Sequence, residues 1–318
     1  MGKSAQQYIA EFRRGEALKS TDFVGGLVVN GRIEKSALSL LTRELATGTP
    51  VVRTNIVELL YRVGLELDKP MPGKFSIIRD HAVMKTLLVE GFAKDDEASS
   101  NAESILRKKC RPADLAVFDE IYINSLRREK GEYLYLIAKA KSSRAAPLVE
   151  ALARSAVWQE SEDYRQIIRI TQAALGNAGI EAEFIAAAVK AERDAPPAPK
   201  NRFYDVGTAR DGKQVAVQLE LLGLIGTPRT LLQVCRFLRS PLKTYVPNIK
   251  ERSIRYDALD ALRYNFPDEK VLSHPVSAVE WRAAEQFCVA NLGATFDGET
   301  PELPPDQIYP TRVAPHMR

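Results

Sequence analysis

The chain has 318 residues, of which 45% are hydrophobic and 27% charged, values typical of a globular protein with a sizeable core. Its net charge of +4 and its pI near 8.8 lie below the strongly basic range of dedicated nucleic-acid binders. No uncharged run approaches the ~20 residues of a membrane span, and residues 1–18 carry charges where a secretory signal would be apolar. We therefore expect a cytoplasmic protein with no membrane partner.

Residues 1–32 predict an N-terminal capping helix and a connection. Apolar residues recur at helical spacing over Ala5–Leu18, and glycines punctuate the DFVGGLVVNG that follows. From residue 33 onward the pattern changes to pairs of helices. In the first pair, KSALSLLTRELATGTP at 35–50 and VVRTNIVELLYRVG at 51–64 each predict one amphipathic helix.

The same pattern of helix, short turn and helix recurs about every 40 to 60 residues as far as residue 293. The later copies are units at 76–110, 113–143 and 144–179, a fifth that begins at 180, a sixth over 227–266, and a last helix near 276–292. Helix pairs in such a series bury their apolar faces only against their neighbours, which is the arrangement of an α-solenoid.

The segment VQLELLGLIGTP at 217–228 indicates how the apolar runs fold. Leucine is more frequent in it than β-branched residues, which favours a buried helix over a strand. We expect Gly226 to end this helix in the left-handed conformation. Pro228 is then placed at the start of the next helix, where no backbone N–H is needed.

The second helices of these pairs resemble those of the HEAT-repeat family. In that family an apolar residue and an arginine precede small apolar residues and a glycine turn, and LLGLIGTP and VRTNIVELLYRVG are similar to this pattern. Arg53 and Arg255 share the arginine position, where we expect each to brace neighbouring units. The resemblance covers most of residues 33–293. It implies an all-α, HEAT-like α-α superhelix (α-solenoid) of roughly six helix pairs in one continuous domain.

Two segments interrupt or follow the repeats. Residues 195–212 are too polar and proline-rich for a helix and predict a loop insertion. Because insertions in solenoids often lie on the binding face, Arg202, Phe203 and Tyr204 are candidates for loop contacts, with a simple linker as the alternative. Residues 294–318 predict a Pro-rich extended or disordered tail.

Residues suited to catalysis or metal binding are few and scattered. The three histidines lie far apart in the sequence and none belongs to a metal-ligand pair, so we expect no metal and no cofactor. Cys235 and Cys288 lie on apolar helix faces and are expected in the core. Cys110 has cationic neighbours in RKKCRP, which we interpret as the charged end of a helix. No catalytic residue is expected.

Basic residues gather in the segment from Arg229 to Arg263, which contains eight basic and three acidic residues. Such a group could bind phosphate or an acidic partner, and the alternative is a solvated helix face with structural arginines. The candidates for binding a partner or phosphate are Arg229, Arg236, Arg239, Lys243, Lys250 and Arg252.

These observations favour a non-catalytic scaffold or adaptor that docks a protein partner on the surface of the solenoid. Nucleic-acid binding through the basic residues is the alternative, which a continuous basic stripe would support. An enzyme is the third hypothesis. HEAT-type hydroxylases need His–Glu metal pairs, which this sequence does not contain. HEAT-like DNA glycosylases need an acidic residue and aromatic residues grouped in a basic groove, which sequence alone does not place.

Overall fold

The computed structural model describes residues 2–19, 22, 24–29, 32–67, 78–94, 96–127, 131–197, 210–244, 252–272, 275 and 277–298. The structure is predominantly helical, which confirms the all-α prediction. Its contacts divide the chain into two compact units, Met1–Glu181 with Tyr264–Asp268, and Ala182–Arg263 with Glu269–Arg318. Within the described ranges, no helix combines the length and the apolar character needed to cross a membrane.

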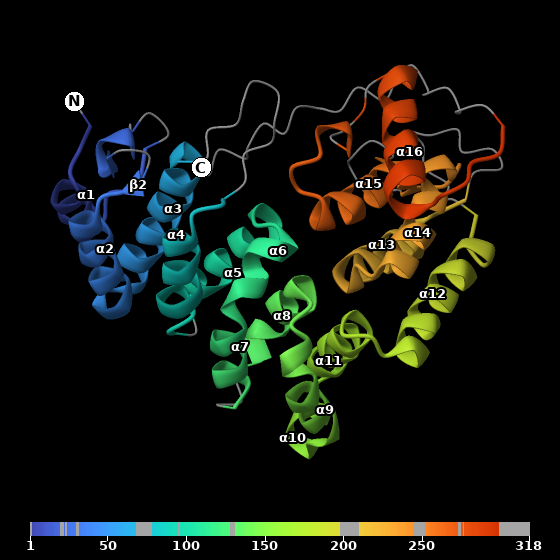
Figure 1. The fold of residues 1–318 in the computed structure, drawn as a ribbon, viewed down its shortest axis with the longest axis horizontal. Helices are drawn as coiled ribbons and strands as arrows, with labels where there is room; N and C mark the ends of the chain where they lie inside the picture. The colour runs from blue at the N-terminus through green and yellow to red at the C-terminus, as the bar shows by residue number, and fades with distance from the viewer. Residues whose placement is uncertain are drawn as a thin grey trace. The chain divides into compact units, whose positions relative to one another are not determined.

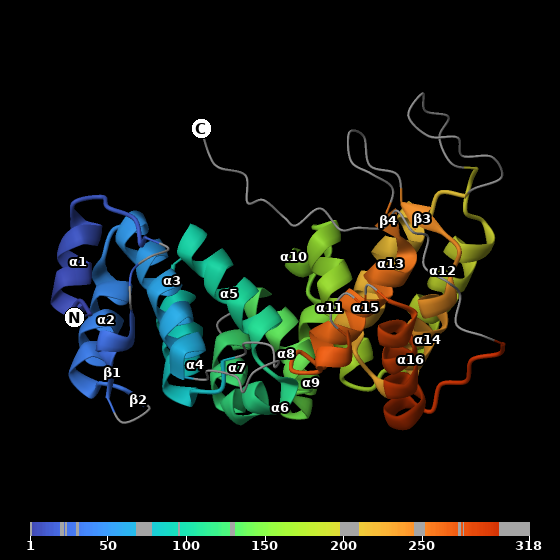
Figure 2. The ribbon, with the colours of Figure 1, turned by 90° about the horizontal axis from the view of Figure 1, so that it is seen from above.

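In the first unit, helices that follow one another in the sequence pack against one another. The helices are α1 (Ala5–Arg13), α2 (Lys35–Thr47), α3 (Pro50–Leu67), α4 (His81–Thr86), α5 (Glu97–Lys109), α6 (Pro112–Leu115), α7 (Asp119–Leu126), α8 (Leu134–Ala140), α9 (Ala146–Arg154), α10 (Ala156–Gln159) and α11 (Glu162–Ala174). α1 packs on α2 and α3, α3 on α5, α5 on α8, and α8 and α9 on α11. Figure 1 and Figure 2 both show α1, α2 and α3 side by side.

Glycine and aspartate set several boundaries of these helices. α1 ends at Arg13 rather than at the expected Leu18 because Gly15 has a φ of +82°, which does not continue a helix. Asp80 accepts the first free N–H groups of α4. Asp96 accepts from the backbone N–H of Ser99 at the start of α5.

Two helices predicted in the first unit are interrupted. In the first half of the unit predicted at 76–110, α4 continues into a π-helical turn, η2 (Leu87–Gly91). This turn passes so close to α5 that a Cβ on Gly91 would lie 2.8 Å from the Cβ of Ala102. Further along, a 3₁₀ turn, η3 (Ala116–Phe118), separates α6 from α7. Short 3₁₀ and π-helical turns such as η3 and η2 leave no distinct apolar period in a sequence, so they were not predicted.

The second unit contains residues 217–228, whose composition predicted a helix rather than a strand. Its elements are most of α12 (Ala178–Arg193), then α13 (Lys213–Ile225), α14 (Pro228–Arg236), η6 (Phe237–Arg239), most of α15 (Ile254–Asn265), η7 (Lys270–Leu272) and α16 (Ala278–Leu292). Gly226 caps α13 with a φ of +59°, and Thr227 caps α14, whose first residue is Pro228. The predicted helix, its glycine cap and its proline start are therefore confirmed. α14 packs between α13 and α16.

Two short antiparallel strand pairs lie in the connections and were not predicted. β1 (Val28–Val29) pairs with β2 (Arg32–Ile33), and β3 (Lys243–Thr244) pairs with β4 (Arg252–Ser253). Each strand has two residues, which is too short for an alternating apolar pattern to appear in the sequence.

The domain boundaries inferred from the sequence stay predictions. The described contacts fall into two units, so they do not test whether 33–293 is one continuous repeat domain. Of the insertion at 195–212, the structure describes its two ends, where Pro197 forms an isolated β-bridge with Arg210. The predicted contact residues Arg202, Phe203 and Tyr204 lie outside the described residues, as does the tail after residue 298.

Candidate functional site

The predicted basic residues of the second unit occupy different environments. Arg229 and Arg236 are exposed on α14, and Arg236 donates from Nη1 to Oε1 of Gln233 over 3.2 Å. Lys243 and Arg252 lie in consecutive positions of the β3–β4 ladder. Lys250 lies outside the described residues.

Arg239 is held inside the second unit by an ion pair. Its Nε and Nη2 donate to the two carboxylate oxygens of Glu285 over 2.8 and 3.0 Å, and the Glu285 side chain is only 6% exposed. The carbonyls of Asp297 and Gly298 accept from Nη1, and the ring of Phe296 lies 5.0 Å from the guanidinium. All of these contacts of Arg239 are with residues of its own chain.

Arg252 is likewise engaged with carboxylates. Its Nη2 lies 2.6 Å from Oδ2 of Asp260 and 3.2 Å from Oδ1 of Asp257. Burial raises the pKa of Asp257 to about 6, although the charge of Arg252 opposes this rise. Arg252 thus neutralises acidic groups of α15.

The two arginines at the repeat position both brace the fold, as the sequence predicts. Arg53, fully buried, donates to the carboxylate of Asp96 over 2.6 Å and to three carbonyls on the helices before and after α3. Arg255 is also buried, donates to the carbonyl of Leu238 over 2.7 Å, and lies 4.1 Å from the ring centroid of Trp281. Desolvation lowers the pKa of Arg255.

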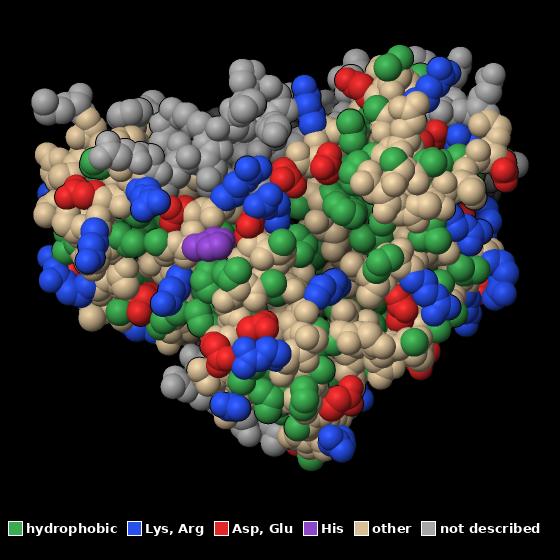
Figure 3. Space-filling view, in the orientation of Figure 1, with side chains coloured by type: hydrophobic (Ala, Val, Ile, Leu, Met, Phe, Trp, Pro, Cys, Tyr) green, Lys and Arg blue, Asp and Glu red, His purple; other side chains and the backbone are tan. Residues whose placement is uncertain are grey.

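The six predicted binding residues therefore do not act alike. Arg239 and Arg252 serve internal ion pairs, and Arg229 and Arg236 face solvent. On the face that Figure 3 shows, blue basic and red acidic side chains are interspersed among apolar and neutral ones. Arg239 and Arg252 thus have a structural role in the described contacts, and the binding role of the other four residues stays a prediction.

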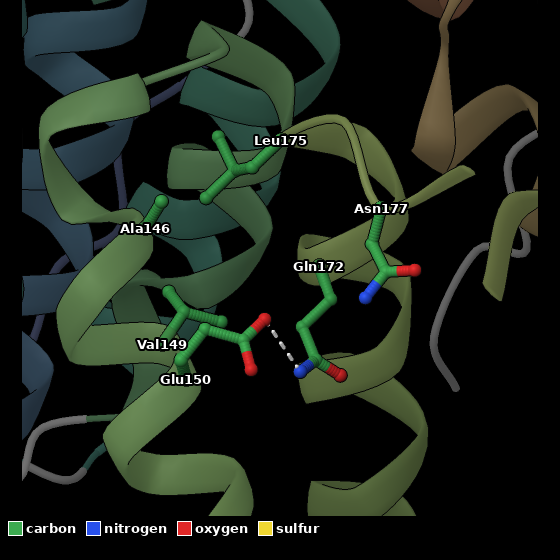
Figure 4. Close-up of a pocket in the computed structure, with 6 residues that line it drawn as sticks. All are labelled: Ala146, Val149, Glu150, Gln172, Leu175 and Asn177. Atoms are coloured by element: carbon green, nitrogen blue, oxygen red, sulfur yellow. Dashed lines mark hydrogen bonds between the residues drawn. The ribbon is translucent and has the colours of Figure 1, made fainter. Parts of the chain in front are cut away.

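The first unit contains a pocket that sequence reasoning missed. It lies between α9 and α11 and extends to the turn before α12, with a volume of about 210 Å³ (Figure 4). Its lining residues are Ala146, Val149, Glu150, Gln172, Leu175 and Asn177. The lining is half apolar and half polar, and it includes one carboxylate.

Local structure brings these side chains to one place. Ala146 and Glu150 are one turn apart on α9, so they share a helix face. Gln172 occupies the inner face of α11, between buried neighbours. Gly176 then has a φ of +106°, which turns the chain so that Asn177 returns to the pocket.

The polar groups of the pocket are only partly satisfied by one another. Nε2 of Gln172 donates to Oε1 of Glu150 over 2.8 Å, as the dashed line in Figure 4 marks. Oδ1 of Asn177 accepts the N–H of Ile180 over 3.2 Å, which caps α12. Among the described residues, Oε2 of Glu150, Oε1 of Gln172 and Nδ2 of Asn177 have no hydrogen-bond partner.

The unpaired groups of the pocket can form hydrogen bonds with a bound molecule. The carboxylate of Glu150 is the one ionisable side chain among its lining residues. The open groups are two acceptors, one of them on a carboxylate, and one amide donor. Elsewhere in the described part of the chain, no cluster of three or more His, Cys, Asp or Glu side chains is arranged to hold a metal ion.

The three cysteines and Lys139 are enclosed in the structure. Cys110, Cys235 and Cys288 are all buried, and a hydrogen bond with the Cys235 thiol, together with burial, raises the pKa of Cys288. Lys139 is fully buried, donates from Nζ to the carbonyl of Arg107, and has its pKa lowered by desolvation to about 7. The thiols are therefore core residues, as predicted for Cys235 and Cys288.

The sequence carried a weak signal for the pocket. Gln172 is a polar residue within the apolar run of RITQAALG, at a position that the helical period assigns to the core. A buried glutamine needs a hydrogen-bond partner, so its position could have prompted a search for one. The partner Glu150 lies on another helix, and the pairing depends on how those helices pack.

No family model matches the sequence, and no curated protein and no solved structure matches it. The HEAT-repeat resemblance therefore stays a prediction that rests on the residues of the helix pairs.

Proposed function

We propose that this protein is a non-catalytic scaffold of the helical-repeat type, which binds a protein partner at the pocket between α9 and α11. The single observation that carries the proposal is the set of open polar groups on Glu150, Gln172 and Asn177, beside an apolar lining. Binding sites of proteins combine apolar contact area with a few polar groups that fix orientation, and this pocket has both.

The packing of the helices supports the repeat part of the proposal. Between α1 and α11 the contacts join helices that are close in the sequence, such as α2 with α3, α3 with α5 and α9 with α11, as expected when each helix pair buries its apolar face against the next. Arg53 on α3 and Arg255 on α15, which share the arginine position of the predicted repeat, each donate to a backbone carbonyl earlier in the chain. Repeat proteins of this kind commonly present extended surfaces to partners.

Nucleic-acid binding is the less supported alternative. It requires cations that can reach phosphates, and salt-dependent affinity grows with the number of such contacts. Arg239 and Arg252 already pair with carboxylates of the same chain. Their ion pairs leave Arg229 and Arg236, both exposed on α14, as the best-placed candidates of the predicted set in the described structure.

Affinity capture from a lysate of the native cells, with and without nuclease, tests the proposal. The pocket variant is Glu150→Gln/Gln172→Ala, and the basic-surface variant is Arg229→Glu/Arg236→Glu, which leaves the internal ion pairs intact. We expect a discrete protein partner that survives nuclease, is lost from the pocket variant and is kept by the basic-surface variant. Recovery of nuclease-sensitive material alone, lost from the basic-surface variant, would contradict the scaffold proposal and support nucleic-acid binding.

A further inference from the structure

The open groups of the pocket define the chemistry of a ligand. Glu150 uses Oε1 to accept from Gln172, which leaves Oε2 and the Gln172 carbonyl oxygen as acceptors. Gln172 lines the pocket and is only 9% exposed, so a ligand that fills the pocket displaces solvent from this side chain. A ligand that fills the pocket must therefore supply donors, because an acceptor left without a donor is costly.

The negative charge of the Glu150 carboxylate favours a ligand whose donors include a cation. No Lys or Arg of the described chain lies within ion-pair distance of the Glu150 carboxylate. Arg154, one turn further along α9, donates from Nε to the backbone carbonyl of Glu150 over 3.2 Å and not to its carboxylate. The negative charge of Glu150 is therefore available to a ligand, and it disfavours anions such as phosphate.

The size and lining of the pocket limit the cation to a slender one. Its volume of about 210 Å³ is below the ~300–1,000 Å³ of sites that enclose drug-sized ligands. Ala146, Val149 and Leu175 supply an apolar wall, which suits a methylene chain. Nδ2 of Asn177 adds one donor at the turn, which can meet a carbonyl beside the cation, as a peptide provides.

We propose that the pocket between α9 and α11 binds the cationic side chain, arginine or lysine, of a basic segment in the partner protein. The inference rests on the proposed scaffold function and adds the chemistry of the partner. The methylenes lie along the apolar wall, and the charged end donates to Glu150 and Gln172. A planar guanidinium has five donors and can satisfy both oxygens, so arginine fits better than lysine.

Titration with small probes tests this assignment without knowledge of the partner. The full chain is titrated with N-acetyl-arginine methylamide and with its neutral isostere, N-acetyl-citrulline methylamide, and binding is followed by ligand-observed NMR. We expect the arginine probe to bind about tenfold more tightly than the citrulline probe, because a charged hydrogen bond to the carboxylate contributes more than a neutral one. N-acetyl-lysine methylamide is expected between the two.

A matched pair of variants assigns the preference to the pocket. Glu150→Gln removes the charge at an exposed position, so the chain should still fold, and we expect the arginine preference to disappear. Glu160→Gln removes the same charge from an exposed residue beyond α10 and should keep the preference. Equal binding of arginine and citrulline by the wild type, or an arginine preference that survives in Glu150→Gln, would overturn the inference.

The two proposals fail in distinguishable ways. If the arginine preference is absent while the nuclease-resistant partner is still lost from the pocket variant, the scaffold proposal stands and the cationic ligand is wrong. If the preference is present and capture yields nucleic acid alone, the cation pocket stands and the scaffold proposal fails.

Discussion

Arg239 and Glu150 show two opposite ways in which this chain holds a charged side chain. Arg239, in the second unit, gives its donors to Glu285 and to two backbone carbonyls, and the ring of Phe296 lies beside it. Glu150, in the first unit, commits one oxygen to Gln172 and keeps the other open to the pocket. The sequence suggested a binding role for Arg239, yet its described contacts are with residues of its own unit.

This difference shows that the number of charged residues in a segment does not indicate how many of them are available to bind a partner. A buried ion pair contributes to stability chiefly through the penalty of breaking it, because the abandoned partner stays desolvated. An open carboxylate at a pocket contributes little to stability and can contribute to binding. We call a charge closed when it is paired within the chain, and open when it faces solvent or the pocket. Substitution of a closed charge should therefore lower the free energy of unfolding, and substitution of the open charge at the pocket should change ligand affinity.

Substitution of Arg53 should give the largest loss of stability. Arg53→Met leaves the Asp96 carboxylate and three carbonyls without their donor in a buried site, so we expect a loss of about 3 to 5 kcal/mol in the free energy of unfolding. Urea unfolding followed by circular dichroism measures it. Arg43→Met, at a side chain that is 67% exposed, is the control and should cost less than about 0.5 kcal/mol. Similar losses in both would break the distinction between closed and open charges.

Substitution of Arg239 should have the next largest effect. Arg239→Met leaves the Glu285 side chain, 6% exposed, without its partner, and we expect a loss of about 2 to 4 kcal/mol. The double variant Arg239→Met/Glu285→Gln removes the stranded charge and should recover part of that loss. A double-mutant cycle by urea unfolding checks the coupling, and purely additive losses would show that the ion pair is not a unit.

The lowered pKa of Lys139 predicts that the free energy of unfolding rises with pH. Its folded pKa of about 7 is depressed below the model-peptide value of 10.5, so between these values the unfolded chain binds more protons than the folded one. The free energy of unfolding should therefore rise by about 1 kcal/mol from pH 7 to pH 8, since each pH unit contributes at most ~1.4 kcal/mol. Lys139→Met should flatten this rise. An unchanged slope in the variant would mean that Lys139 does not titrate in this range.

Substitution of Glu150 should have the smallest effect on stability. Glu150→Gln keeps an acceptor for Gln172 at an exposed position, so we expect a change below about 0.5 kcal/mol in the free energy of unfolding. Its effect on the arginine probe should nevertheless be about tenfold. Urea unfolding and the probe titration on the same preparation check both values. A strongly destabilised Glu150→Gln protein would place this residue with the closed charges.

Local features of the fold could be predicted from the sequence where one residue type dictates one conformation. Gly226 and Pro228 stand where a helix ends and the next begins, and both have the expected role. The bracing of Arg53 was expected from the arginine position that it shares with Arg255 in the HEAT-like pattern. The π-helical turn ending at Gly91 could not be predicted, because it depends on the close approach of α5.

The candidate site was harder to predict because its residues are defined by partners on other helices. Arg239 and Arg252 look like surface cations in the sequence, and only the positions of Glu285 and Asp260 show that they are paired. Glu150 and Gln172 are 22 residues apart and meet only when α9 packs on α11. Hydrogen-bond satisfaction is a property of tertiary structure, so sequence pattern alone does not reveal which polar groups stay open.

The most direct test of the central claim is competitive release of the captured partner. The wild-type chain, loaded with its nuclease-resistant partner, is washed with N-acetyl-arginine methylamide or, at matched ionic strength, with N-acetyl-citrulline methylamide. The account predicts that the arginine probe releases the partner and that the citrulline probe does not. Retention of the partner against both probes, or equal release by both, would contradict the claim that a cationic side chain in the α9–α11 pocket holds the partner.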